Sequence, residues 1–321
     1  MNQGLRTFLE GIVDYAGLFP PAQLEMGAAV AQFADHSRGP HAWMLGRFVC
    51  PAGQFGSFEA ALETQHRGSE PVRVAAIARP LGTVSEIGTQ LHEDLVAMHE
   101  LHARSGGRAV VECVELRLPP QAGTTLETAR ETIDAIALQV VETGTRASGE
   151  EHRLLETYVE MGGSMQRSAV EAVADALSGR PGFGLKLRCG GPSAEAIPSV
   201  EAVAHVLAEC RERGVPLKAT AGLHHLIRHH DAALGASMHG FFNLFGAGVL
   251  GYAHSLTEEE LLPILEEERA ESFVFEESGF RWRQIPIDLE TLQRVRARFV
   301  TSFGSCSFDE PVADLQSLGL L

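Results

Sequence analysis

Short apolar runs alternate with segments of helical periodicity from about residue 11 to about residue 250. Strands are predicted over residues 12–15, 43–50, 72–77, 109–118 and 153–159, around residues 186 and 218, and over 237–242. Helices are expected between them, among others from Thr83, from Ser164 and over 223–234. Eight strands that alternate with helices predict a parallel (β/α)8 TIM barrel over residues 1–254. Near-continuous apolar strands fit this fold, because parallel strands are buried on both faces.

The pattern changes after residue 254. A capping-box sequence at 257–260 predicts a helix to about residue 270, and residues 273–287 read as a hairpin. A last helix is expected over 289–303. We therefore expect residues 255–321 to form a C-terminal helix–hairpin–helix appendage that packs on the barrel.

Composition narrows the classes of partner. The formal net charge of −16 argues against nucleic acid and anionic membranes as partners. Five cysteines without a Cys-x-x-Cys spacing are typical of reduced thiols in a cytoplasmic protein. The N-terminus shows no signal peptide, and the longest apolar run, 241–253, is too short to span a bilayer. We expect a cytoplasmic protein that acts on a small molecule, with a homodimer as the candidate assembly.

Lysine is rare in this chain. Of 26 basic residues only Lys186 and Lys218 are lysines, and each follows a short apolar run and precedes small residues and glycine. Both therefore lie near the end of a predicted strand. An ammonium group can lose its proton and become a nucleophile, which a guanidinium group effectively cannot. The alternative is that both are incidental surface lysines. Their matched sequence contexts make this alternative the less favoured one.

In a TIM barrel, side chains at the C-terminal ends of the strands share one mouth. Strand alternation places acidic groups there on the first, fourth and fifth strands, and on the fifth both Glu156 and Glu160 share this face. Two neighbouring ammonium groups disfavour each other's charge, so one can be a neutral amine near pH 7. An amine with nearby carboxylates is suited to Schiff-base chemistry on a carbonyl group. The candidate catalytic residues are Lys186, Lys218, Asp14, Glu156 and Glu112, with Glu115 as the alternative acid on the fourth strand.

The order of motifs resembles the deoxyribose-phosphate aldolase family of class I aldolases over about residues 11–250. The similar segments are Val13–Pro20, Phe48–Pro51, Val74–Gly82, Leu154–Thr157, the two lysine strands and Gly235–Gly240. The resemblance implies that Lys186 forms the carbinolamine and Schiff base, that Lys218 tunes it, and that no cofactor or metal is needed. It also implies that the acid of the fourth strand falls on Glu112, in place of the family's usual Asp.

The phosphate site of that family is not kept in this sequence. Residues 240–243 read Gly-Phe-Phe-Asn where the family has small residues that bind phosphate. We therefore expect an unphosphorylated aldehyde, ketone or oxo-acid as substrate. Arginine forks match carboxylates, so Arg188 and Arg79 are candidate substrate ligands. Thr220, His224 and His225 are further candidates at the same rim.

Two other readings remain open. The histidines between His224 and His239 suggest a metal-dependent hydrolase or isomerase that also uses Asp14, Glu112 or Glu156, although no established zinc spacing is present. Asp14 and Glu156 are equally compatible with a structural role inside the barrel. A barrel without catalysis is the second alternative, because this fold carries many unrelated functions.

Overall fold

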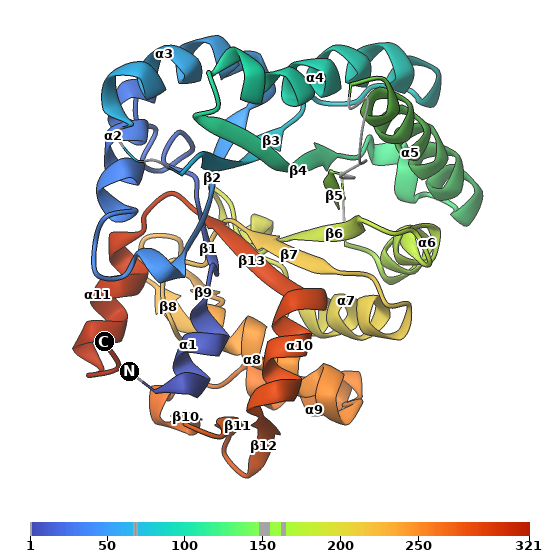
Figure 1. The fold of residues 1–321 in the computed structure, drawn as a ribbon. Coiled ribbons are helices and arrows are strands. Elements are labelled where there is room, and N and C mark those ends of the chain that lie inside the picture. Colours follow the sequence, from blue (N-terminus) through green and yellow to red (C-terminus); the bar gives the residue numbers. More distant parts are fainter. Residues whose placement is uncertain (1, 67, 69, 148–154, 162–164) are drawn as a thin grey trace.

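The computed structural model describes residues 2–66, 68, 70–147, 155–161 and 165–321 (Figure 1). Eight parallel strands form a closed barrel in the order β1-β13-β7-β6-β5-β4-β3-β2. They are β1 (Val13–Tyr15), β2 (Leu45–Pro51), β3 (Val72–Ile77), β4 (Ala109–Arg117), β5 (Glu156–Glu160), β6 (Phe183–Arg188), β7 (Leu217–Thr220) and β13 (Val300–Ser305). The predicted TIM-barrel fold is confirmed.

Helices surround the strands on the outside of the barrel (Figure 1). They are α1 (Gln3–Leu9), α2 (Met26–His36), α3 (Phe55–Gln65), α4 (Val84–Arg104), α5 (Leu126–Ala147), α6 (Arg167–Leu177), α7 (Val200–Glu212), α8 (Phe241–His254), α9 (Glu258–Leu265), α10 (Leu289–Arg298) and α11 (Asp309–Ser317). As predicted, Thr83 begins a helix, because its side chain and that of Glu86 form a capping box at the start of α4.

Strand alternation divides the core into two parts. Side chains such as Leu185 and Leu187 of β6 point outward and belong to the large apolar core that includes the helices. A smaller cluster is separate from this core and includes Val49 of β2, Ala75 of β3, Cys113 of β4 and Tyr158 of β5. We call it the inner apolar cluster. Burying each large apolar side chain contributes about 1.5–3 kcal/mol, so the outer core dominates the stability. The inward positions can therefore hold charged groups.

The predicted eighth strand is wrong. Residues 236–238 form β9 (Ala236–Met238), which pairs antiparallel with β8 (His229–Asp231) outside the barrel, and the helix expected over 223–234 is absent there. The apolar run that follows is the start of α8, which is buried from Phe241 to Gly251. A helix buried on all sides is apolar all round, so its first residues resemble a buried strand.

The barrel is closed instead by β13, between β1 and β7. Residues 300–303 were expected at the end of a helix over 289–303, but that helix, α10, ends at Arg298. The segment after residue 254 therefore completes the barrel, which corrects the division into a barrel over 1–254 and an appendage over 255–321. The predicted hairpin is part of a three-stranded antiparallel sheet of β10 (Phe273–Glu276), β11 (Gly279–Trp282) and β12 (Ile285–Asp288).

Two other predicted boundaries can be followed only in part. The fifth strand was expected from Arg153, which lies outside the described residues, and β5 begins at Glu156. The helix expected from Ser164 also starts outside them, and α6 begins at Arg167.

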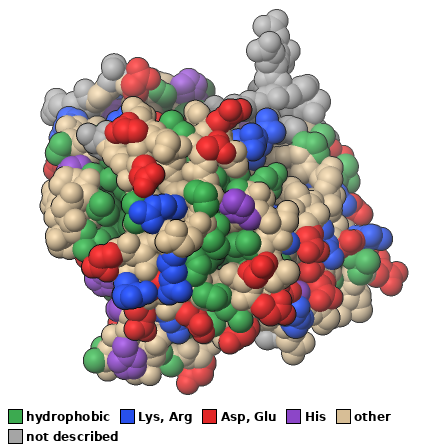
Figure 2. Space-filling view, turned by 90° about the horizontal axis from the view of Figure 1, so that it is seen from below, with side chains coloured by type: hydrophobic (Ala, Val, Ile, Leu, Met, Phe, Trp, Pro, Cys, Tyr) green, Lys and Arg blue, Asp and Glu red, His purple; other side chains and the backbone are tan. Residues whose placement is uncertain are grey.

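Charges of both signs share the surface. Figure 2, seen from below the view of Figure 1, shows acidic and basic side chains interspersed on the face that includes α9 and the β10–β12 sheet. Arg283 and Glu267, whose atoms Nη2 and Oε2 lie 2.6 Å apart, are one such pair. Among the described helices, none is both long and apolar enough to cross a membrane. All five cysteines are buried and unpaired.

Candidate active site

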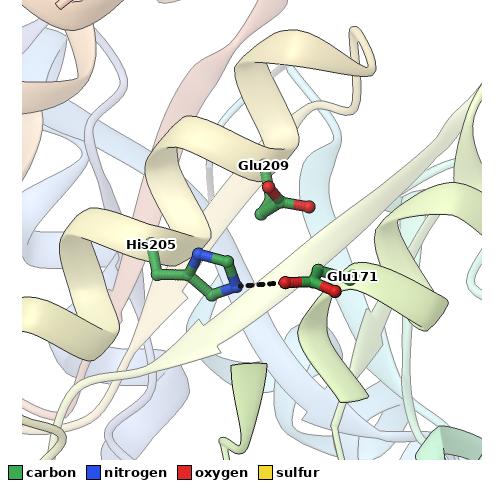
Figure 3. Close-up of side chains that lie close together, drawn as sticks. All are labelled: Glu171, His205 and Glu209. Carbon is green, nitrogen blue, oxygen red and sulfur yellow. Dashed lines mark ion pairs between the residues drawn. The ribbon is translucent and has the colours of Figure 1, made fainter. Parts of the chain in front are cut away.

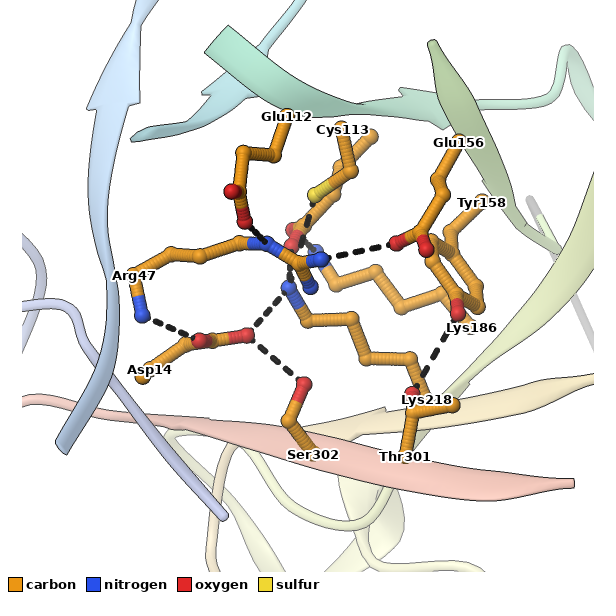
Figure 4. A network of polar contacts seen from close by, with 12 residues as sticks. Asp14, Arg47, Glu112, Cys113, Glu156, Tyr158, Lys186, Lys218, Thr301 and Ser302 are labelled. Atoms are coloured by element: carbon orange, nitrogen blue, oxygen red, sulfur yellow. Dashed lines mark hydrogen bonds and ion pairs between the residues drawn. The ribbon is translucent and has the colours of Figure 1, made fainter. Parts of the chain in front are cut away.

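Lys186 of β6 and Lys218 of β7 lie next to each other inside the barrel. They are register partners on adjacent parallel strands, so their side chains leave the sheet at the same level (Figure 4). The Lys186 side chain is 9% exposed and that of Lys218 is 0% exposed. The sequence expectation that both lysines face one interior therefore agrees with the structure.

Glu115 of β4 lies between the two ammonium groups. Its Oε2 is 2.7 Å from Lys186 Nζ, and its Oε1 forms an ion pair with Lys218 Nζ. Glu160, the last residue of β5, binds Lys186 with Oε2 at 3.1 Å, and Asp14 of β1 binds Lys218 with Oδ2 at 2.7 Å. We call Asp14, Glu115, Glu160, Lys186 and Lys218 the lysine group. It contains two cations and three carboxylates.

The ion pairs of the lysine group favour the charged forms of Glu115 and Lys218. Burial disfavours the charged form of Glu115, but Lys186 and Lys218 more than offset it and lower the pKa of Glu115 to about 2. Burial likewise opposes the charge on Lys218, yet Asp14 and Glu115 raise the pKa of Lys218 well above its usual value. The expected mutual repulsion of two lysines is thus offset by a carboxylate between them. Lys218 is charged near neutral pH.

Asp14 connects β1 to three other strands. Its Oδ1 accepts a hydrogen bond of 2.6 Å from the backbone N–H of Arg47 in β2. Its Oδ2 accepts one of 2.7 Å from the Ser302 hydroxyl in β13, in addition to the Lys218 contact. Gly46 is needed beside it, because a Cβ there would clash with the Asp14 carboxylate. A buried carboxylate with this many donors is firmly oriented.

Glu112 and Glu156 take part in a second group, on the side where β5 begins. Arg47 Nε lies 3.0 Å from Glu112 Oε2, and Arg47 Nη2 lies 2.8 Å from Glu156 Oε2 (Figure 4). We call Arg47, Glu112 and Glu156 the arginine group. A cavity of about 170 Å³ adjoins it and also reaches Asp14 and Ser302. The two acids that the sequence placed at the lysines thus bind an arginine.

A β-bulge explains why the acid of β4 was hard to assign. Val74 of β3 is the partner of Val111, but the next residue of β3, Ala75, is the partner of Cys113. Glu112 is therefore an extra residue in β4, and the alternation of faces shifts by one residue after it. Glu115, which simple alternation from Glu112 puts on the other face, consequently pairs with both lysines. Glu115 was the alternative left open by the sequence.

The predicted substrate ligands differ in what they contact. Arg188 Nε lies 3.1 Å from Glu160 Oε1. The same carboxylate binds Lys186 through its other oxygen, so it lies between the two cations. Thr220 is the register partner of Arg188 and is half-buried. Arg79 instead binds two acids of α4, Asp94 at 2.9 Å and Glu93 at 2.8 Å. Those contacts engage two of its three guanidinium nitrogens.

The histidines near the rim bind the last helix. His224 Nδ1 lies 2.8 Å from Glu310 Oε2 and His225 Nδ1 lies 3.0 Å from Asp314 Oδ2, both acids belonging to α11. The ring of His225 packs edge-on against that of His229, with centroids 4.6 Å apart. These contacts give both predicted ligands a structural role in holding α11. No set of three metal-ligand atoms within 4.8 Å of one another involves this stretch among the described residues.

One group of possible metal ligands does occur elsewhere in the described chain. Glu171, His205 and Glu209 bring ligand atoms within 4.8 Å of one another on α6 and α7 (Figure 3). His205 Nδ1, however, already lies 2.8 Å from Glu258 Oε1, and Glu209 Oε2 lies 2.6 Å from Arg213 Nη1. These contacts account for the cluster as ion pairs at the end of α7 and between α7 and its neighbour α9.

Sequence reasoning missed two residues of the site, Arg47 and Ser302. Glu160, which alternation places on the same face of the fifth strand as Glu156, does bind Lys186 in the structure. Arg47 similarly shares a face with Val49 of the inner apolar cluster. Ser302 had no usable signal, because the strand that carries it was read as a helix.

Comparison with known proteins adds little to this site. No model of a protein family matches the chain, and no curated protein matches it. Eight chains of solved structures match. One is DHODH from Eimeria tenella in complex with ferulenol, with a TM-score of 0.35 and 11% sequence identity over 69% of this chain. The match spans 66% of that chain, just under two thirds of its length. A likeness this weak carries no argument about activity.

Proposed function

We propose that this protein is a lyase of the class I aldolase type that forms a Schiff base on Lys186. The observation that carries the proposal is the pairing of a lysine at the C-terminal half of β6 with two carboxylates that other cations hold in place. Lys186 is also the less buried of the two lysines. The resemblance to the deoxyribose-phosphate aldolase family supports the same residue.

Lys186 must lose its proton before its amine can attack a carbonyl carbon. Glu160 Oε2, 3.1 Å away, is the acceptor in this scheme. Burial raises the pKa of Glu160, but Lys186 and Arg188 more than offset this and hold that pKa below its usual value. Glu160 therefore passes the proton on to solvent. Glu115 stays ionised beside the nitrogen and stabilises the positive charge of the iminium ion.

The bonding changes are those of imine chemistry. The Lys186 amine adds to the carbonyl carbon, and the carbinolamine loses its hydroxyl as water after protonation. In the direction of cleavage, a hydroxyl group on the carbon beta to the iminium carbon loses its proton and becomes the carbonyl group of the second product. The electron pair of the carbon–carbon bond that breaks passes to the iminium ion, which becomes an enamine. Protonation of the enamine and hydrolysis release the product and restore the amine. Lys218 keeps its proton and orients Asp14 and Glu115 throughout.

The start of α8 supports an unphosphorylated substrate. The N–H groups of Phe241 and Phe242 donate to the carbonyl oxygens of His225 and Leu226, at 3.1 and 2.8 Å. These first donors of the helix are therefore engaged and do not form a phosphate site. Both phenylalanine side chains are fully buried in the core. They are thus core residues and offer no ligand to a phosphate group.

Reductive trapping tests the proposal directly. The protein is incubated with small aldehydes, ketones and oxo-acids in the presence of cyanoborohydride, and peptides are analysed by mass spectrometry. With only two lysines in the chain, the modified peptide identifies the nucleophile. We expect an adduct on Lys186 that is lost in Lys186→Arg. A folded protein that forms no adduct with any carbonyl, or forms one only on Lys218, contradicts the assignment.

A further inference from the structure

The barrel interior around Lys186 has a charged side and an apolar side. Glu160, Lys186 and Arg188 are linked by ion pairs on β5 and β6. On the other side, Ile77 of β3 is the register partner of Glu115, the acid that contacts both lysines. Phe19, in the turn after β1, packs with Ile77 against the inner apolar cluster. A molecule bound at Lys186 therefore meets both kinds of surface.

Arg188 has donors to spare. A guanidinium group carries five N–H donors. Its Nε binds Glu160 and its Nη1 donates to the carbonyl of Gly190 at 3.3 Å, while Nη2 has no partner among the described residues. The side chain is 48% exposed and lies at the C-terminal end of β6, beyond Lys186. A carboxylate placed there would receive two charge-assisted hydrogen bonds.

The short separation between the Lys186 amine and the Arg188 guanidinium group suits one kind of carbonyl compound. The Glu160 carboxylate binds Lys186 through one oxygen and Arg188 through the other, so amine and guanidinium are held at a fixed, short separation. In a 2-oxo acid the carboxylate is attached to the carbonyl carbon itself. When the Lys186 amine is bonded to that carbon, the neighbouring carboxylate lies within hydrogen-bonding distance of Arg188. An isolated aldehyde leaves Arg188 unused.

The apolar side selects the rest of the molecule. Hydroxyl groups against Ile77 and Phe19 would lose hydrogen bonds to water without replacement, which is unfavourable. An alkyl substituent there is instead removed from water. Both side chains are only partly buried in the structure, so they can be covered by a ligand.

We propose that the compound activated on Lys186 is a 2-oxo acid with an apolar side chain, which binds its carboxylate to Arg188 and its alkyl group to Ile77 and Phe19. It takes part in the direction of carbon–carbon bond formation: its iminium ion loses a proton from carbon 3 to give the enamine, the enamine attacks the carbonyl carbon of an aldehyde, and the aldehyde oxygen takes up a proton. This inference rests on the proposed Schiff base at Lys186. The covalent step is the one given above: the C–N bond forms, the carbonyl C–O bond breaks, and the oxygen leaves as water. Polyhydroxylated carbonyl compounds are poor substrates.

Three matched probes test the inference by the rate of reductive trapping on Lys186. 2-Oxobutanoate carries both features, propanal lacks the carboxylate, and hydroxypyruvate replaces the terminal methyl group by a hydroxyl. In Arg188→Gln we expect trapping of 2-oxobutanoate to fall about ten- to a hundredfold relative to trapping of propanal, whose own rate measures the effect of losing the Arg188–Glu160 ion pair. In Ile77→Thr we expect the preference for 2-oxobutanoate over hydroxypyruvate to shrink several-fold. Arg130→Gln removes an exposed arginine that pairs with Asp175 outside the barrel, and it serves as the control.

The outcomes separate the two proposals. If propanal and 2-oxobutanoate fall equally in Arg188→Gln, the arginine only orients Glu160 and the inference is overturned. An unchanged rate for 2-oxobutanoate also overturns it. If no probe is trapped in the unmodified protein, the Schiff-base function fails. The carboxylate site is then tested alone by calorimetry with 2-hydroxybutanoate, which cannot form an imine and should bind more weakly to Arg188→Gln.

Discussion

The barrel encloses two groups of charges that look alike in composition and differ in chemistry. In the arginine group one cation binds two acids, and in the lysine group two cations share three acids. Glu156 is about half exposed, with 48% of its side chain accessible, whereas Lys218 and Glu115 are fully enclosed. A guanidinium group keeps its proton under all ordinary conditions, but a lysine can become a nucleophile. The ion pairs of the arginine group therefore have a structural role, whereas those of the lysine group surround a candidate nucleophile.

The largest effect is expected for Lys218→Met. This change leaves Asp14 and Glu115 buried without their shared cation, and breaking a buried ion pair costs about 3–5 kcal/mol. We expect the free energy of unfolding in urea to fall by that amount. If Lys218→Met is less destabilising than Arg47→Met, then the lysine group is not the more tightly enclosed of the two.

Acid should weaken the protein through Glu115. Its folded-state pKa of about 2 lies below the ordinary value of 4.5, so its stabilisation is complete above about pH 4.5 and is lost as the pH falls towards 2. Between pH 6 and pH 3 the native protein should lose about 2 kcal/mol more than Glu115→Gln does. Urea unfolding at a series of pH values measures this difference. Parallel stability curves for the two proteins would show that Glu115 is not held as a carboxylate by the lysines.

Arg47→Met should have a smaller effect, about 1–2 kcal/mol, because half-exposed Glu156 can be hydrated when its partner is lost. Asp14 keeps its hydrogen bond, since it accepts from the backbone N–H of residue 47. Trapping of a carbonyl compound on Lys186 should therefore continue at an unchanged rate. A large loss of trapping with a folded protein would show that the arginine group also tunes the lysines.

The barrel fold and the inward position of the two lysines could be predicted from the sequence, because both follow from regular patterns. Seven of the eight barrel strands were recognised from apolar runs, and alternation put Lys186 and Lys218 on the inward face. The acid of β4 was left open because a bulge at Glu112 interrupts that alternation. No local property of a sequence reports where a bulge will form, since it depends on the register of the neighbouring strand.

The closing strand was missed for a different reason. Residues 300–305 follow α10 with one residue between them, and the sequence offers no turn signal at that point. Only Val300 and Phe303 are large and apolar among them, because the inward positions carry small or polar side chains. The all-apolar start of α8 made a stronger local case for a strand. The distinction depends on packing between segments that are distant in the sequence.

The smallest expected effect tests this correction of the fold, through the sign of a stability change. In β13 the Ser302 hydroxyl donates to buried Asp14 at 2.7 Å, so Ser302→Ala should lower the free energy of unfolding by about 1 kcal/mol. If residue 302 lay in a helix, as first expected, alanine would raise it by about 0.5 kcal/mol, because alanine has the higher helix propensity. Ser168→Ala, at an exposed position of α6, is the matched control and should give that small gain. Because Ser302 and Lys218 both contact Asp14, the losses from Ser302→Ala and Lys218→Met should not add, and strictly additive losses would show that the two contacts are energetically independent.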